Sequence, residues 1–457
     1  MLRYPLLVPD LRELIRAGET SALQDFFEGH HPAHVAELIE DLEDEGDAIL
    51  EVLPDRLEAQ VMSYVAPERQ VRVVEAMPPE QAAILLHYMS HDDRADLVNR
   101  LDEERVDLIL RHLAQAERED IRRLASYEPG TAGAVMTTDY ATLAPTLTVR
   151  EALDRLRREA TDKETIDYSY VVDDEHKLLG FVPLKRLIMA SPRTRIDQLM
   201  NRDMIQARVD DDQEAVAQQI DRYDLPAIPI VDAADMLVGI VTHDDAMDIL
   251  RKEQTEDILA FGAVATDAQS DEQGYWQGRI TSAVRNRIGW LLMLFITGSL
   301  TSFVLRSFNW VDRGFPHLNF DIFIPLLIGT GGNAGSQTVG TIIRGLALGE
   351  IQPSDGPRVV LREWLTGTLM GSMLGTLGFA FSYLLHHDLA FSSVIALTIL
   401  GICMWANSVG ALVPLLAKKL GIDPALVSAP LISTLVDATG LIIYYLLAIL
   451  LLIRLGR

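Results

Sequence analysis

Hydrophobic residues recur at helical spacing through the first 130 residues, and prolines divide this pattern. Pro32, Pro54 and the pair Pro78 and Pro79 stand 22 to 25 residues apart. The stretch PPEQAAILLHYMSHDDRADLVNRL, which starts at the last of these breaks, predicts two short helices joined by a polar turn. Repeated helix pairs of this kind indicate a small helical solenoid. We therefore expect residues 1–130 to form an all-α helical-repeat domain.

Short β-rich runs alternate with helical patterns in residues 131–255, and the segment contains an internal repeat. MTTDYATL (136–143) parallels MNRDMIQA (200–207), and YVVDDEHKLLGFV (170–182) parallels IPIVDAADMLVGIV (228–241). Two copies of about 60 residues with helices between strands predict a two-fold α/β module. The second copy ends GIVTHDDAMDIL, and this resembles the signature of tandem cystathionine-β-synthase (CBS) domains.

Long uncharged stretches fill the last third of the chain. They cover residues 288–305, 322–343, 364–385 and 389–417, and 424–453 with one charge inside it. A membrane-spanning helix needs about 20 mostly apolar residues, so we predict five spans within a membrane domain at 279–457. The alternative, five buried helices of a soluble protein, is disfavoured because such runs rarely follow one another in soluble folds. Residues 256–278 are predicted to form a connector helix leading into this domain.

The third span contains Gly367, Gly371 and Gly375, a doubled G-x-x-x-G. Small residues four apart let another helix backbone approach closely, so we expect tight packing there. Basic residues flank the predicted inner ends of the spans more often than the outer ends, eight against four, when the N-terminus is placed inside. The positive-inside rule therefore favours a multi-pass protein of the cell (inner) membrane with cytoplasmic N-terminal domains.

Charge is distributed unevenly between the two parts of the chain. The net charge is -26, and residues from Arg279 onward carry 12 basic and 8 acidic side chains. The part before Arg279 therefore holds 28 basic and 58 acidic residues, a balance of -30. Nucleic acid is excluded as a partner of this part because its phosphates would be repelled. The candidate partners of this acidic part are cations or basic proteins.

Asp437 is the one ionisable side chain inside the five predicted spans. An intramembrane carboxylate costs several kcal/mol, about 2.5–3.5 on translocon scales, so it marks a function by default. It can bind a proton or a cation. The alternative is a structural acid paired with a neighbouring hydroxyl, for which Thr434 and Thr439 are close enough in sequence.

The stretch GTGGNAGSQTVG (329–340) satisfies the spacing of a dinucleotide-binding loop. Its flanks are apolar on both sides, so that interpretation fails, and with it an enzyme using a nucleotide cofactor. Glycines in a spanning helix allow close packing, and they also allow local unwinding that exposes carbonyl oxygens. We expect an unwound segment whose carbonyls and neutral side chains, such as Asn333, suit a hydrated cation like Mg²⁺.

Acidic residues cluster at predicted helix starts in the soluble part. Each cluster fits helix capping, including S-H-D-D (90–93) and T-H-D-D (242–245) as capping boxes. Taken together, the clusters favour cation binding, because a compact module with a net charge of -30 would repel itself unless cations neutralised it. His30, His31 and His34 form a trio without a further metal ligand, so we assign them a surface or structural role.

At this point the chain resembles the MgtE-type magnesium channel family, over essentially its whole length. The matching motifs are LLIGTGGNAGSQ (326–337), ANSVGALVPLL (406–416), GIDPALVSAPL (421–431) and STLVDATG (433–440). The resemblance implies a homodimer, surrounded by membrane lipid, with a cation pore between subunits. It places Asp437, Gly329 and Asn333 at the Mg²⁺ ion of the pore.

The resemblance also implies regulatory Mg²⁺ sites in the cytosolic part that close the pore when Mg²⁺ is plentiful. The matching acids are Asp92, Asp96, Asp212, Glu214, Asp224, Asp245, Asp248, Glu253, Glu256, Asp257 and Asp423. Two positions depart from the family: Ala429 stands where relatives often have Asn, and Gln60 where relatives have Glu.

CBS pairs of this family can bind adenine nucleotide. The second copy keeps the ribose-type positions Thr242 and Asp245, whereas the first has Pro183 and Arg186. One ATP site, in the second copy, therefore remains a prediction, with Tyr168 as a further contact. We expect a Mg²⁺-selective channel-like transporter and not an enzyme. Transport of Co²⁺, Mn²⁺ or Ca²⁺, proton coupling through Asp437, and a non-conducting Mg²⁺ or nucleotide sensor remain alternatives.

Overall fold

The computed structural model describes residues 7–160, 163–265, 280–315 and 318–453. These fall into two compact units, residues 1–253 and 254–457. One long helix, α15 (His243–Phe261), carries the chain from the first unit into the second. Most of the predicted connector, residues 266–279, lies outside the described residues.

The first unit begins with short helices that pack in a row. Prolines stand at the first or second position of several, where the missing N–H costs nothing, and so set the helix starts. The bounds are α1 (Val8–Ala17), α2 (Thr20–Phe27), α3 (Pro32–Asp41), η1 (Glu43–Gly46), α4 (Asp47–Leu50), α5 (Asp55–Met62), α6 (Pro67–Ala76), α7 (Pro79–Tyr88), α8 (His91–Arg100), α9 (Glu103–Leu110) and α10 (Gln115–Leu124). Helix α3 packs on α5, α5 on α7 and α7 on α9, as in a solenoid. The predicted helical repeat is confirmed.

Two three-stranded sheets follow, one in each sequence repeat. Their order is β1-β2-β3 and β4-β5-β6, with a parallel first pair and an antiparallel second pair in both. The strands are β1 (Tyr140–Leu143), β2 (Thr165–Val172), β3 (Leu178–Pro183), β4 (Ala207–Arg208), β5 (Ala227–Val231) and β6 (Leu237–Thr242). The helices are α11 (Val149–Glu159), α12 (Leu184–Met189), α13 (Ile196–Leu199) and α14 (Gln213–Tyr223). This identical topology confirms the two-fold α/β module.

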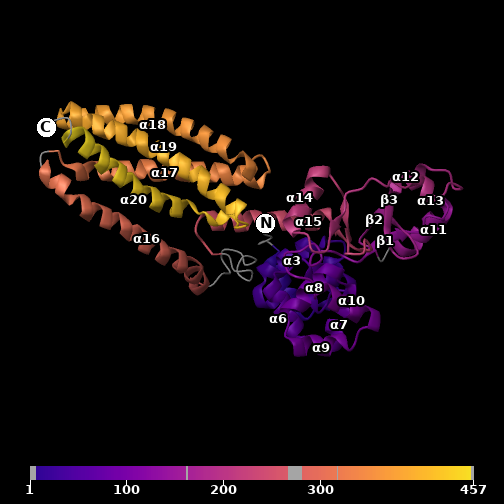
Figure 1. Ribbon diagram of the computed structural model, residues 1–457. Helices are drawn as coiled ribbons and strands as arrows, with labels where there is room; N and C mark the ends of the chain where they lie inside the picture. The colour runs from indigo at the N-terminus through magenta and orange to yellow at the C-terminus, as the bar shows by residue number, and fades with distance from the viewer. Residues whose placement is uncertain (1–6, 161–162, 266–279, 316–317, 454–457) are drawn as a thin grey trace. The chain divides into compact units, whose positions relative to one another are not determined.

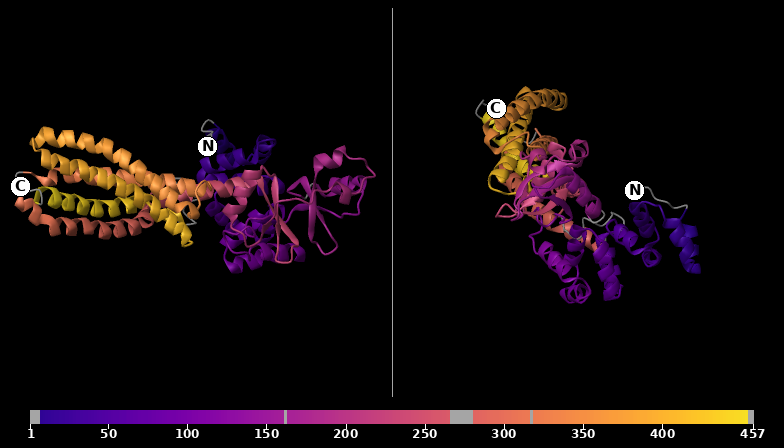
Figure 2. Two further views of the ribbon diagram at one scale, coloured as in Figure 1. Left: turned by 45° about the horizontal axis from the view of Figure 1, so that its top comes forward. Right: turned by 90° about the vertical axis from the view of Figure 1, so that its right-hand side faces the viewer.

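The second unit is built from long helices, which lie side by side in both views (Figures 1 and 2). They are α16 (Ile280–Gly314), α17 (Ile324–Ala347), α18 (Gly356–His386), α19 (Leu389–Lys419) and α20 (Ala429–Ala448). Short turns join them: η3 (Phe320–Phe323), η4 (Pro353–Asp355), η5 (Pro424–Leu426) and the π-type turn η6 (Ile449–Ile453). Many large apolar side chains of these helices are exposed, for example Phe295 and Leu369, which suits contact with lipid.

Four of the described helices are long and apolar enough to cross a membrane: Ile280–Gly314, Pro353–His386, Leu389–Lys419 and Ala429–Leu452. Helix α17 is long enough, but its glycines and polar residues lower its hydropathy below that of the other four. The fifth span therefore stays a prediction.

The doubled G-x-x-x-G of α18 lies against α19. A Cβ on Gly371 would stand 2.8 Å from the Cα of Leu400, and a Cβ on Gly367 would stand 2.7 Å from the carbonyl oxygen of Cys403. Real Cβ atoms do not approach backbone so closely, so only glycine permits this contact. The predicted tight packing is confirmed, and it occurs within one chain.

Candidate functional site

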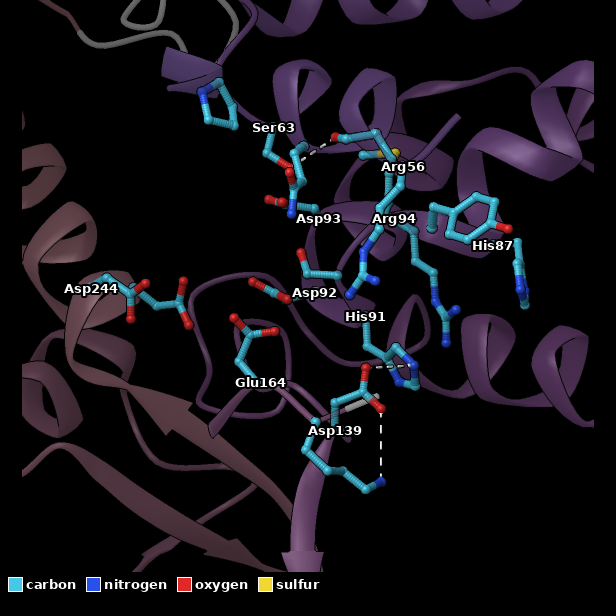
Figure 3. Close-up of a pocket in the computed structure, with 18 of the residues that line it drawn as sticks. Arg56, Ser63, His87, His91, Asp92, Asp93, Arg94, Asp139, Glu164 and Asp244 are labelled. Carbon is cyan, nitrogen blue, oxygen red and sulfur yellow. Dashed lines mark hydrogen bonds and ion pairs between the residues drawn. The ribbon is translucent and has the colours of Figure 1, made fainter. Parts of the chain in front are cut away.

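A cleft of about 1040 Å³ in the first unit gathers acidic side chains from distant parts of the sequence (Figure 3). We call it the acidic cleft, and its carboxylates are those of Asp92, Asp93, Glu117, Asp120, Asp139, Glu164, Asp244, Asp245 and Asp248. It therefore unites acids of the helical repeat with acids of the CBS-like module.

Local structure explains how these acids reach the cleft. Helix α8 begins at His91, which places Asp92 and Asp93 in its first turn. Helix α15 begins directly after β6, which places Asp244 and Asp245 in its first turn. Acids favour such positions because the helix N-terminus carries partial positive charge. The two helix starts share the cleft with Glu164, which immediately precedes β2.

Burial and mutual repulsion shift the pKa values of these carboxyls upward. Burial first, and then the charges of Asp245 and Asp93, raise the pKa of Asp92. Burial, with Asp244 and Asp93 adding to it, raises the pKa of Asp245 to about 6. The pKa of Glu164 is raised to about 7 by burial and then by Asp245 and Asp244. A bound cation relieves the same repulsion that a proton relieves.

Among the described residues, no group of three or more His, Cys, Asp or Glu side chains is arranged to hold a metal ion directly. The oxygens of the cleft are of the hard type that Mg²⁺ prefers, and Mg²⁺ usually keeps several of its waters when a protein binds it.

An ionic cluster in the lining of the acidic cleft fastens the helical repeat to the CBS-like module. His91 Nδ1 lies 2.9 Å from Asp120 of α10, and His91 Nε2 lies 3.0 Å from Asp139, which precedes β1. Burial alone would lower the pKa of His91, but these two carboxylates raise it. His91 and the buried Arg94 likewise hold the pKa of Asp120 well below its usual range despite burial. Protonated His91 can donate to both carboxylates at once.

The other predicted regulatory acids lie outside the acidic cleft. Asp212 caps α14 through the N–H of Ala215 at 3.1 Å, and Asp423 caps η5 through the N–H of Ala425 at 2.8 Å. Glu214 and Glu253 accept hydrogen bonds from glutamine side chains. The remaining positions are Asp96, exposed on α8, Asp224, at the left-handed C-cap of α14, and Glu256 and Asp257, half-buried on α15 in the second unit. Helix capping thus accounts for some of these acids, as the sequence allowed.

The predicted capping boxes have different outcomes. Asp245 accepts hydrogen bonds from the Thr242 hydroxyl and from the backbone N–H of Thr242, and the second of these is one half of a capping box at 242–245. Ser90 is the N-cap residue of α8, but it makes no side-chain capping bond, and its buried hydroxyl has no protein partner. The box predicted at 90–93 is therefore wrong. His31 of the histidine trio caps α3, because its Nδ1 accepts from the N–H of Ala33 at 3.2 Å.

A second cleft, of about 470 Å³, lies between the two copies of the CBS-like module. Thr242 lines it, whereas Asp245 lines the acidic cleft. Tyr168 packs on Phe181, with ring centroids 4.8 Å apart, and is not among the residues of the lining. The structure thus links Thr242 and Asp245 directly by hydrogen bonds, whereas Tyr168 packs on Phe181 outside this lining.

Asp437 is half-buried on α20, next to the contact of α20 with α17. A Cβ built on Gly332 would collide with the Ser433 hydroxyl and stand 3.5 Å from Asp437 Oδ1. Thr434 and Thr439 donate to carbonyl oxygens of their own helix, at 2.9 and 2.8 Å. The hydroxyls suggested as partners of a structural acid are therefore engaged with the backbone.

Helix α17 is continuous from Ile324 to Ala347, so the predicted unwinding of the glycine-rich stretch is wrong. Its glycines serve packing: a Cβ on Gly331 would stand 2.5 Å from Ile402 and 2.8 Å from Val436. Helical hydrogen bonding occupies the carbonyl oxygens that unwinding would have exposed. Gly329 and Asn333, four residues apart, lie on the exposed face of the helix, and nothing stands within 4 Å of a Cβ built on Gly329.

The two family departures have defined positions. The carbonyl oxygen of Ala429 accepts a hydrogen bond from the Ser336 hydroxyl at 3.3 Å, which links α20 to α17. Gln60 lines the acidic cleft, so the cleft carries an amide there.

Several residues of the site escaped sequence reasoning. Glu164, Asp120 and Asp139 come from separate segments that meet only in the tertiary fold. Glu164 belongs to the charged stretch TDKETID, which carries no motif. Only the adjacency of His91 to the S-H-D-D acids offered a signal.

Family models match three segments of the chain. They are the MgtE intracellular N domain at residues 30–130, CBS domains at 132–193 and 196–252, and the MgtE divalent cation transporter domain at 324–447.

Named relatives extend the match to nearly the whole chain. The chain is 40% identical over 454 residues to the magnesium transporter MgtE of Thermus thermophilus, covering 98% of both chains. It is 36% identical over 326 residues to the magnesium transporter MgtE of Enterococcus faecalis, covering 71% of this chain and 70% of that protein.

The first unit also resembles a solved structure. The cytosolic domain of the Mg²⁺ channel MgtE in complex with ATP is 37% identical, with a TM-score of 0.51, and covers 53% of this chain and 100% of that one. The helical repeat, the CBS pair and the bundle of apolar helices therefore occur together as they do in these relatives. The chain belongs to the MgtE family of divalent cation transporters.

Proposed function

We propose that this protein is a Mg²⁺-selective, channel-like transporter of the cell (inner) membrane, and that two copies form the pore. The observation that carries the proposal is the position of Asp437, a carboxylate of α20 beside the glycine contact with α17. A carboxylate in hydrocarbon costs about 2.5–3.5 kcal/mol, and a function that needs negative charge accounts for it.

The exposed face of α17 supports the same proposal. Gly329 and Asn333 lie one helical turn apart on that face and are both exposed, and no described atom stands within 4 Å of a Cβ built on Gly329. A second subunit would enclose this face and bring two Asp437 carboxylates toward one axis. Since α17 is continuous, the neutral ligands are side-chain oxygens such as that of Asn333. Such a site attracts a cation through its water shell.

Flux of Mg²⁺ into proteoliposomes tests the pore. Asp437→Asn keeps the shape of the side chain and should reduce flux at least tenfold. The matched control is Glu350→Gln, which removes one exposed acid from the same unit and should leave flux unchanged. Undiminished flux in Asp437→Asn would refute the assignment. Competition by Co²⁺, Mn²⁺, Ca²⁺ and protons separates Mg²⁺ selectivity from the other transport classes, and absence of any flux would indicate a sensor.

We further propose that cytosolic Mg²⁺ closes the pore by occupying regulatory sites. Asp92, Asp245 and Asp248 share the acidic cleft, so a cation there joins the helical repeat to the CBS pair. The remaining regulatory acids proposed from the family resemblance are Asp96, Asp212, Glu214, Asp224, Glu253, Glu256, Asp257 and Asp423. Without Mg²⁺ the acids repel one another, so the first unit opens. With Mg²⁺ bound, the first unit becomes compact and shifts the position of α15, which leads into the second unit.

Closure is measured as the loss of flux when Mg²⁺ is raised on the cytosolic face. The double variant Asp92→Asn/Asp245→Asn should need several-fold more Mg²⁺ for half-closure. Asp154→Asn, which removes an exposed acid of α11, is the control. An unchanged closure curve would mean that the acids serve only capping and solvation.

The second cleft is the proposed nucleotide site. Its support is the relative whose cytosolic domain was solved with ATP, together with Thr242 in the lining. Binding of labelled adenine nucleotide to the full chain, abolished by filling the cleft with Thr242→Phe, tests it. The domain limits 1–130, 131–255, 256–278 and 279–457 remain our proposed division.

A further inference from the structure

The second cleft has an unusual charge for a nucleotide site. Four carboxylates line it, from Glu164, Asp167, Asp224 and Asp244, together with the hydroxyls of Thr165 and Thr242. None of the described residues in the lining is a lysine or an arginine. A site built for free phosphate presents basic side chains or a helix N-terminus free of acids.

Two basic residues of the first copy are directed elsewhere. Lys163, the neighbour of Glu164, points to Asp139 at 4.0 Å and lines the acidic cleft instead. Arg186, which stands at the ribose-type position of the first copy, donates to the carbonyl oxygen of Leu199 at 2.9 Å. Residues 161 and 162, outside the described part, are Thr and Asp, so neither can supply positive charge.

Carboxylates also determine which ligand groups fit the cleft. An ionised carboxylate accepts hydrogen bonds and donates none, so it favours ligands rich in donors. Ribose hydroxyls and an exocyclic amino group are such donors, and the apolar side chains of Leu225 and Pro226 in the lining suit the face of a base. A phosphate is mainly an acceptor at neutral pH, and each of its charges adds repulsion from the ionised acids of the lining, among which Glu164 is only partly ionised because its pKa is raised to about 7.

We propose that this cleft selects against negative charge, and that it binds a nucleoside in preference to the same nucleoside carrying free phosphates. The inference rests on the proposed nucleotide site and specifies the class of its ligand. A nucleoside triphosphate then binds only when divalent cations cover its phosphates. His243, the remaining polar residue of the lining, is neutral or cationic and so does not reverse this preference.

Equilibrium dialysis of the full-length protein in detergent, with EDTA to remove divalent cations, tests the charge preference. The probes are radiolabelled adenosine, AMP and ATP. The expected order of affinity is adenosine, then AMP, then ATP, with at least a tenfold span from first to last. Metal-free ATP binding as tightly as adenosine overturns the proposal. Adenosine failing to bind at millimolar concentration also overturns it, and the cleft is then a cation site only.

Variants of the lining locate the effect. Asp167→Asn/Asp224→Asn should raise the affinity for metal-free ATP at least threefold and change that for adenosine less than twofold. Asp224 adopts a left-handed backbone with φ of 50°, which asparagine also tolerates, so the fold is preserved. The control Asp154→Asn should change neither affinity. If the lining variant also changes neither, the ligand binds elsewhere and the proposal fails.

Mg²⁺ flux measured on the same preparations keeps the two proposals apart. If the affinity order fails while the wild type shows normal Mg²⁺ flux and Asp437→Asn does not, only the proposed ligand class is rejected. A correct affinity order without any flux rejects the transport proposal and retains the nucleoside preference.

Discussion

Replacing Asp245 by Asn should make the metal-free first unit more stable. The carboxylate of Asp245 shares the acidic cleft with Asp92, Asp93 and Asp244, and their repulsion is unrelieved without a cation. Asparagine removes the charge while its amide oxygen can still accept the hydrogen bond from the Thr242 hydroxyl. The variant therefore separates the effect of charge from the effect of shape.

The size of the effect follows from the pKa. A rise from 3.8 to about 6 is roughly 2.2 pKa units, which corresponds to about 3 kcal/mol at most. Asp245 shares this repulsion with Asp92 and is partly hydrated, so we expect ~1–2 kcal/mol. For a unit of this size that corresponds to ~2–8 °C in the melting temperature.

The sign of the pH dependence is fixed by the direction of the shift. Because the folded-state pKa is raised, the folded protein holds this proton more tightly than the unfolded chain does. The stability that this proton confers is present below the unfolded pKa and is lost as pH rises through about 6. The wild type therefore loses this stability mainly between pH 3.8 and about pH 6, and Asp245→Asn loses less.

Hydrogen exchange of the full-length protein in EDTA measures this locally. The amides of α8 and the first turn of α15 should exchange ~5–30-fold more slowly in Asp245→Asn than in the wild type at pH 8, after correction for intrinsic rates. The difference between the two proteins should be clearly smaller at pH 4.5, which lies below the folded pKa of about 6. Mg²⁺ should slow exchange in the wild type more than in the variant. Faster exchange in the variant at pH 8, or an equal difference at both pH values, would refute the reasoning.

Three further outcomes are expected. Gly371→Ala should lower stability in detergent by ~1–3 kcal/mol through overpacking against Leu400, whereas Gly298→Ala, with nothing within 4 Å, should cost nothing measurable by thermal melting. His91→Ala should cost ~2 kcal/mol at pH 6 by removing its contacts with two carboxylates. Because the pKa of His91 is raised, this cost should shrink in melts as pH rises through that value.

Periodicity and repeats were sufficient to predict the architecture. The proline-divided helices, the two α/β copies and the long apolar helices are each specified by local sequence, so they were predicted from it. Close packing at the glycine face of α18 was also predicted, because small residues four apart let another backbone approach, but the sequence did not identify α19 as the partner.

Tertiary contacts decided what local sequence could not. The glycines of 329–340 allow both unwinding and close packing, and the fit of Gly331 between Ile402 and Val436 selects packing. The acidic cleft depends on Asp92 and Asp245, which lie about 150 residues apart in sequence. No local pattern brings them together, and only the family resemblance placed both in regulatory sites.

Glu164 and Asp244 line both the acidic cleft and the second cleft, so a shared wall of two carboxylates separates them. If both proposed sites are occupied, a cation on one side of this wall neutralises charge that a ligand on the other side also meets. By thermodynamic reciprocity, each occupant then changes the affinity for the other by the same factor. A single coupling free energy, obtained from one pair of titrations, would then give both the effect of bound Mg²⁺ on nucleoside affinity and the effect of bound nucleoside on Mg²⁺ affinity.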